Sequence, residues 1–170
     1  DQFNGLFGYI DNSTIKNIGV VNANIQSNNI FGGVLAGGVL NSTIENAYST
    51  GILNISVDDN DWGTVAGGLV GILNHSTINN SYSTVKTTGI SKTGGLVGYL
   101  FNSSTINNSY ATGEVTGTGN NIGGLVGSNT SSSVTNSFWD TQTSGQATSA
   151  AGVGKTTAQM KDKSTFDGWD

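Results

Sequence analysis

The sequence predicts an all-β chain that winds into a right-handed parallel β-helix, or β-solenoid, of about five coils. Three observations favour this fold: a unit that returns about every 28 residues, an alternating pattern within each unit, and the absence of proline from all 170 residues. Proline removes a backbone donor from a β-ladder, so a chain whose strands are nearly all central disfavours it. Connections between parallel strands are almost always right-handed, which predicts the hand of the coil.

The repeat is clearest in one asparagine column, whose members are separated by 29, 34, 28 and 28 residues. An Ile or Val precedes each asparagine by two positions, and an aromatic residue follows four of them by two positions. A spacing of two is that of a strand with one buried face, so we expect the three columns to share a face. The columns are Asn17, Asn46, Asn80, Asn108 and Asn136; Ile15, Ile44, Ile78, Ile106 and Val134; and Gly19, Tyr48, Tyr82, Tyr110 and Phe138.

The stacked coils are expected to enclose a core of Leu, Val and Ile. A leucine column, made of Leu6, Leu35, Leu69, Leu96 and Leu125, belongs to it. The asparagine column has two structural interpretations. Its amides could bond to one another as a ladder along the stack, or each asparagine could occupy a bend in the left-handed αL conformation, which Asn tolerates better than most residues.

Composition excludes several classes of protein. Six basic residues, all of them lysine, against 11 acidic ones give a net charge of −5, which argues against a nucleic-acid partner. Without cysteine there is no disulfide framework and no thiolate chemistry. Residues 17–44 carry no charge, but their longest apolar run is too short to cross a bilayer, so we expect no membrane insertion.

The last residues depart from the repeat. We expect residues 1–137 to form the solenoid and residues 138–170 a C-terminal cap or junction, whose aromatic side chains would cover the last coil. Thr157 is expected to cap a short helix that extends to about Lys163. The chain opens with Leu6 and Phe7 in core columns and no polar cap before them, so we expect it to be part of a larger polypeptide.

Each unit also carries a short Gly-Leu-apolar-Gly signature: GLFG at 5–8 and GLVG at 68–71, 95–98 and 124–127, with VLAG at 34–37 as a departure. These residues resemble the GLUG repeat, and residues 138–161 look like the segment that commonly follows the last such repeat. GLUG repeats occur in large bacterial surface adhesins and in surface-anchored peptidases that cleave immunoglobulin A. The resemblance therefore implies an extracellular module at a bacterial cell surface, and it implies no particular ligand.

The best candidate binding site in the sequence is an acidic stretch in the longest unit. Asp58, Asp59 and Asp61 are hard-cation ligands. We expect Trp62 beside them to cover the base of the loop, with stacking on a sugar as the alternative. The stretch lacks the bidentate Glu of a full calcium loop. We expect no cofactor, with calcium at this loop as the alternative to a solvated surface loop.

Catalytic chemistry finds little support in the sequence. His75 is the only histidine, and the carboxylates Asp11, Glu45 and Glu114 belong to different columns. The segment 152–157, GVGKTT, lacks the first glycine of a phosphate-binding loop. We therefore expect no enzyme and no catalytic or metal-binding residue.

The sequence thus predicts a non-catalytic extracellular repeat module of an adhesin-like protein, acting in cell adhesion as a rigid stalk, a ligand-binding surface or both. A host glycan or an extracellular protein would be its partner. Three alternatives remain: a polysaccharide-active β-helix enzyme, an accessory domain of a secreted peptidase, and an ice-binding solenoid that uses the threonine column Thr14, Thr43, Thr77 and Thr105.

Overall fold

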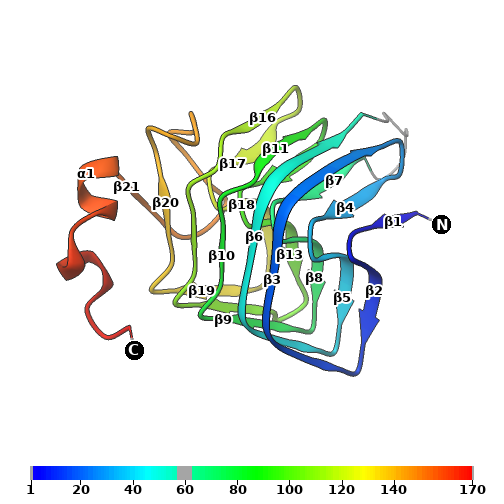
Figure 1. Cartoon of the computed structure of the whole chain (residues 1–170), viewed down its shortest axis with the longest axis horizontal. Helices are drawn as coiled ribbons and strands as arrows, with labels where there is room; N and C mark the ends of the chain where they lie inside the picture. The colour runs from blue at the N-terminus through cyan, green and yellow to red at the C-terminus, as the bar shows by residue number, and fades with distance from the viewer. Residues whose placement is uncertain (1, 57–62, 170) are drawn as a thin grey trace.

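A computed structural model describes residues 2–56 and 63–169 of the chain. Parallel strands stack into a β-solenoid of about five turns, and Figure 1 shows the stacked coils. Within the described residues, helix is confined to α1 (Thr157–Met160) and η1 (Lys163–Phe166). The prediction of an all-β solenoid is confirmed, whereas its right-handed winding stays a prediction.

Three parallel sheets form the walls of the solenoid. Sheet A contains β1 (Phe3–Asn4), β4 (Phe31–Gly33), β7 (Val65–Gly67), β12 (Lys92–Gly94) and β17 (Asn121–Gly123). Sheet B contains β2 (Phe7–Asp11), β5 (Ala36–Leu40), β8 (Val70–Asn74), β13 (Val97–Phe101) and β18 (Val126–Thr130). Sheet C contains β3 (Thr14–Ser27), β6 (Thr43–Ile55), β9 (Thr77–Asn79), β10 (Tyr82–Ser83), β11 (Lys86–Gly89), β14 (Thr105–Asn107), β15 (Tyr110–Ala111), β16 (Val115–Gly117), β19 (Ser133–Thr135), β20 (Phe138–Asp140) and β21 (Val153–Lys155).

The core lies where the predicted columns place it. The Ile/Val column pairs in register through sheet C, and its three middle members are fully buried: Ile44, Ile78 and Ile106. Four members of the leucine column are also fully buried, but Leu6 is 57% exposed, so its assignment to the core is wrong. Leu6 belongs to the first described coil and is therefore covered by a neighbouring coil on one side only.

The prediction that Ile, Asn and Tyr share one face is also wrong. Asn46 has a φ of 53°, which breaks the alternation of the strand. Beyond it Ala47 and Ser49 are buried, so Tyr48 between them faces outward and is only half-buried. The tyrosines instead form an exterior stack on sheet C, with ring centroids 5.1 Å apart for Tyr48 and Tyr82.

Two columns of buried serine join successive coils at the bends of the chain. At one bend, the Ser42 N–H donates to Ser76 Oγ (3.0 Å) and the Ser76 N–H donates to Ser104 Oγ (3.2 Å). At the next bend, the Ser81 N–H donates to Ser109 Oγ (3.2 Å) in the same way. Each hydroxyl therefore satisfies a backbone donor that the bend removes from the β-ladder.

Glycines within and directly before the Gly-Leu-apolar-Gly signature allow sheets A and B to meet closely; Gly67 and Gly94 directly precede the signatures that begin at Gly68 and Gly95. A Cβ atom on Gly67 would lie 2.6 Å from the nitrogen of Gly98, and one on Gly94 would lie 2.7 Å from the nitrogen of Gly127. No side chain fits at such a distance, so the signature marks the corner between two sheets.

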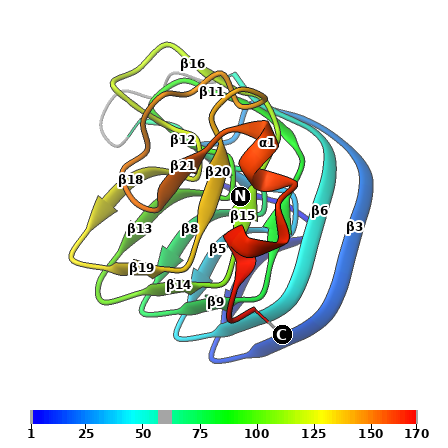
Figure 2. The same ribbon diagram turned by 90° about the vertical axis from the view of Figure 1, so that its left-hand side faces the viewer.

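The segment after β20 lies at the C-terminal end of the coil stack, where Figure 2 shows α1 in front of the strands. Strand β21 pairs with β20, and Trp139 is buried. Helix α1 begins after Thr156, whose hydroxyl accepts from the Gln159 N–H while the Gln159 side chain accepts from the Thr156 N–H. The prediction that Thr157 caps a helix to Lys163 is therefore wrong, because this capping box lies one residue earlier and the helix ends at Met160. The division of the chain at residue 137 stays a prediction.

Candidate functional site: an aromatic groove between two sheets

An aromatic groove of about 400 Å³ runs over the outer side of the corner between sheets A and B. Outward side chains of successive coils line it, because the bend at the signature glycines turns the two sheets toward each other. We define the groove by six of its residues: Phe3, Phe31, Tyr9, Ile72, Tyr99 and Phe101.

The rings of the groove come from both sheets. From sheet A, Phe3 and Phe31 have ring centroids 5.0 Å apart, and Phe3 also lies 5.1 Å from Tyr9 of sheet B. Three coils along from Tyr9, Tyr99 and Phe101 stack at 4.6 Å with nearly parallel planes. The groove therefore has an aromatic cluster near each of its two ends.

One coil carries glycine at a lining position, and this glycine makes room for the rings of the first cluster. Gly38 pairs with Tyr9 on one side and with Ile72 on the other. A Cβ atom on Gly38 would lie 2.7 Å from Phe3 and 2.8 Å from Tyr9, so the rings occupy the space that a side chain would need.

Polar groups stand beside the rings. Tyr9 is 50% exposed, and desolvation together with the nearby charge of Asp11 raises the pKa of its phenol, which therefore stays protonated and able to donate. Asn74 lines the groove and accepts a hydrogen bond from Asn102 (2.9 Å). The Lys92 ammonium lies 5.4 Å from the centre of the Tyr99 ring. Rings with a few polar groups at their edges suit a ligand that has both apolar faces and hydroxyl groups.

The asparagine column lies at a bend of sheet C, away from the groove. All five members have positive φ, between 43° and 56°. In addition, the Asn46 amide donates to Asn17 (2.9 Å) and the Asn108 amide donates to Asn80 (3.3 Å). The αL bend thus occurs in all five asparagines, and amide hydrogen bonds join two pairs of them across neighbouring coils.

The structure keeps the candidate catalytic residues apart. Glu45 forms an ion pair with Lys16 (2.7 Å) and Glu114 forms one with Lys86 (2.8 Å), both at the surface of sheet C. His75 lies exposed at a bend with a φ of 46°. Among residues 2–56 and 63–169, no group of three or more His, Cys, Asp or Glu side chains could hold a metal ion. Asp58, Asp59, Asp61 and Trp62 lie outside the described residues.

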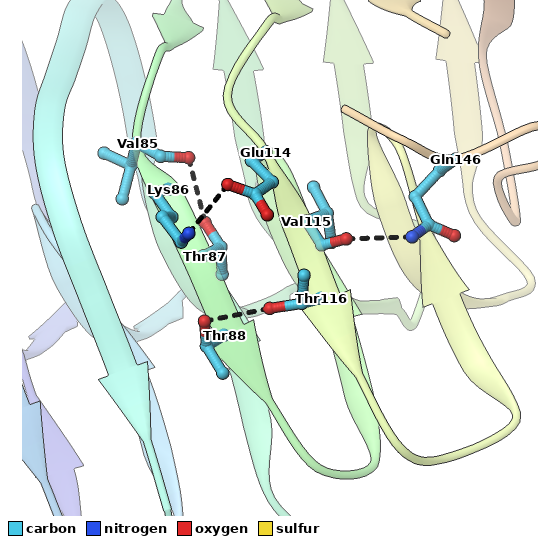
Figure 3. Close-up of polar contacts among 8 residues, drawn as sticks. All are labelled: Val85, Lys86, Thr87, Thr88, Glu114, Val115, Thr116 and Gln146. Carbon is cyan, nitrogen blue, oxygen red and sulfur yellow. Dashed lines mark hydrogen bonds and ion pairs between the residues drawn. The ribbon is translucent and has the colours of Figure 1, made fainter. Parts of the chain in front are cut away.

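Lys86 and Glu114 belong to a row of polar contacts that links successive coils, shown in Figure 3. The hydroxyls of Thr88 and Thr116 lie 2.9 Å apart, and Gln146 donates to the carbonyl of Val115 (2.8 Å). The predicted threonine column also stacks in register, with the hydroxyls of Thr77 and Thr105 2.9 Å apart. These contacts run along the stack, so they join coils rather than surround a ligand.

Sequence reasoning missed the groove, although a signal for it was present. Its sheet B column is formed by the residue that directly follows each Gly-Leu-apolar-Gly signature: Tyr9, Gly38, Ile72, Tyr99 and Ser128. The position varies while the signature does not, which is typical of a surface column on a fixed scaffold.

Comparison with known proteins supports the resemblance inferred from the signature. Residues 91–116 match the family model of the GLUG motif, and they run from just before β12 into β16. The chain carries a GLUG-repeat region. No curated protein and no solved structure is significantly similar to the chain. Within residues 2–56 and 63–169, no helix is long and apolar enough to cross a membrane.

Proposed function

We propose that this GLUG-repeat chain is a non-catalytic extracellular module of a bacterial adhesin-like surface protein. It serves as a stiff spacer and presents the aromatic groove to a host glycan. In this role the chain uses no cofactor and catalyses no reaction. The binding role is supported by the aromatic groove, which lies on the outside of the solenoid at the corner between sheets A and B.

The spacer role is supported by how the coils are joined. Backbone ladders in three sheets, two serine columns and the asparagine ladder all run along the same axis. At about 4.8 Å per coil, five coils extend the chain by about 24 Å. Each coil contacts its neighbours only, so a longer run of such repeats would extend the rod without a change of design.

The glycan role is supported by the chemistry of the groove. Pyranose rings have apolar C–H faces that pack on aromatic rings, and their hydroxyl groups bond to amide and phenol groups at the edges. Phe3 with Tyr9, and Tyr99 with Phe101, provide such rings on two coils that lie apart along the axis. A chain of sugars lying along the groove would contact both clusters.

A glycan array, followed by calorimetry on the best hit, tests this proposal. We expect Tyr99→Ala to weaken binding by about tenfold or more, since it removes a stacking ring. The matched control is Tyr48→Ala, which removes a tyrosine from the outward stack on sheet C. Equal loss of binding in both variants, or no glycan bound by the unmodified chain, would contradict the glycan role. Binding that persists in EDTA is expected, because the groove needs no metal ion.

A further inference from the structure

A second hollow, of about 640 Å³, lies on the other side of the solenoid between sheet C and the C-terminal segment. Six of its residues carry the argument: Thr84, Thr112, Asp140, Tyr110, Phe166 and Trp169. Ser83, Ala111 and Trp139 pair with one another in successive coils. The residues that directly follow them, Thr84, Thr112 and Asp140, therefore form one outward column. We call this hollow the Asp140 pocket.

Asp140 contributes a buried carboxylate to this pocket, with only 2% of the residue exposed. One of its oxygens, Oδ1, accepts hydrogen bonds from the backbone N–H groups of Gln142 (2.9 Å) and Thr143 (3.1 Å) and from the Thr157 hydroxyl (3.0 Å). Within residues 2–56 and 63–169, no ion pair reaches Asp140 and no hydrogen bond reaches its second oxygen, Oδ2. A buried carboxylate held only by neutral donors is a favourable place for a cation.

Aromatic rings form another wall of the Asp140 pocket. Phe166 and Trp169 meet edge to face at 5.0 Å, and both lie close to Tyr110, at 6.1 Å and 6.2 Å. All three residues line the hollow, and the planes of Phe166 and Trp169 are 75° apart. Aromatic faces attract cations, most strongly where water is excluded.

We propose that the Asp140 pocket binds a primary alkylammonium group, the chemistry of a lysine side chain of a partner protein. Oδ2 of Asp140 would accept from the ammonium, the hydroxyl of Thr112 in the adjacent coil would accept a second proton, and the alkyl chain would pack along Thr84 and the rings. Lys161 also lines the pocket and competes for it. The pocket lies on sheet C, so this inference does not depend on glycan binding in the aromatic groove.

NMR titration of the Trp169 indole signal tests the inference with two probes of equal size, n-butylammonium and neutral n-butanol. We expect the ammonium to bind about tenfold more tightly than the alcohol, the difference that one carboxylate contact and the ring faces provide. Equal affinity for the two probes would overturn the proposal and leave only an apolar hollow.

Asp140→Asn is the decisive variant, because an amide oxygen can still accept from the three donors that hold Oδ1. It should abolish the preference for the ammonium, whereas Asp167→Asn, the same loss of charge elsewhere in the C-terminal segment, should retain it. Phe166→Leu leaves every hydrogen bond of Asp140 in place and should weaken ammonium binding several-fold while butanol binding stays the same. An unchanged preference in both Asp140→Asn and Phe166→Leu would refute the site.

Two further probes distinguish the source of the ammonium. Nα-acetyl-lysine amide should bind at least as well as n-butylammonium, and glucosamine should bind more weakly, because its ammonium is attached directly to a hydroxylated ring and carries no alkyl chain to pack on the aromatic rings. Tighter binding of glucosamine would overturn the assignment to a lysine side chain.

Discussion

At the scale of single residues, small polar side chains replace the backbone hydrogen bonds that bends remove. Ser109 accepts from the Ser81 N–H and donates to the Asn107 carbonyl, so one hydroxyl satisfies two groups. The asparagines at the bends combine a backbone conformation that few residues tolerate with amide contacts between coils. Both devices use Ser and Asn, polar residue types that mostly lie at protein surfaces.

Ser109→Ala should lower the free energy of unfolding by about 1–3 kcal/mol, because it leaves the buried Ser81 N–H without an acceptor. Urea denaturation measures this loss. Ser133→Ala, at an exposed position of β19, serves as the control and should change stability little. Equal stability of the two variants would show that the serine column is not needed.

Asn108→Ala should destabilise the chain by about 1 kcal/mol, and Asn108→Gly should cost less, because only alanine is strained at a φ of 46°. Thermal unfolding of the three proteins gives the order. If glycine proves as damaging as alanine, the amide contact rather than the bend determines the role of this asparagine.

At the scale of elements, the sequence repeat predicted the coils and the Ile and Leu columns of the core except Leu6, and it offered a bend at each asparagine as one of two interpretations. It did not predict the division into sheets A and B or the outward direction of the tyrosines. In a regular strand, residues two apart lie on the same face. A residue in the αL conformation, such as Asn46, breaks this alternation of faces although the spacing of the columns in the sequence stays the same. The groove was missed for a related reason: its rings lie in different coils and meet only once the glycine corner is known.

Gly98→Ala tests the glycine corner. A Cβ atom there would lie 2.8 Å from the carbonyl oxygen of Ala66 in the preceding coil, so we expect a loss of about 1–3 kcal/mol in unfolding free energy. Gly8 holds the same place in its GLFG signature, but its nearest neighbour would be 3.6 Å away. Gly8→Ala should therefore be nearly neutral in the same urea titration, and comparable losses would contradict the corner.

At the scale of the whole molecule, the chain is a one-dimensional stack in which each coil buries its interior against the next. A charge placed inside one coil should therefore destabilise the whole described solenoid. Ile106 is fully buried between Ile78 and Val134, whereas Ile52 is 43% exposed.

Ile106→Asp should lower the unfolding midpoint sharply, by about 4 kcal/mol or more in unfolding free energy, because it buries an unpaired carboxylate. Ile52→Asp makes the same chemical change on the outer face and should have a small effect. Midpoints that match in the two variants would place Ile106 outside the interior.

Contacts between the methyl groups of isoleucines one coil apart provide the most direct measurement of the stack. In a methyl-labelled sample, Ile44 should show nuclear Overhauser effects to Ile78, and Ile78 to Ile106, because their strands pair in parallel register. Absence of these contacts, or cross-strand contacts in an antiparallel order, would contradict the solenoid and with it the groove and the Asp140 pocket.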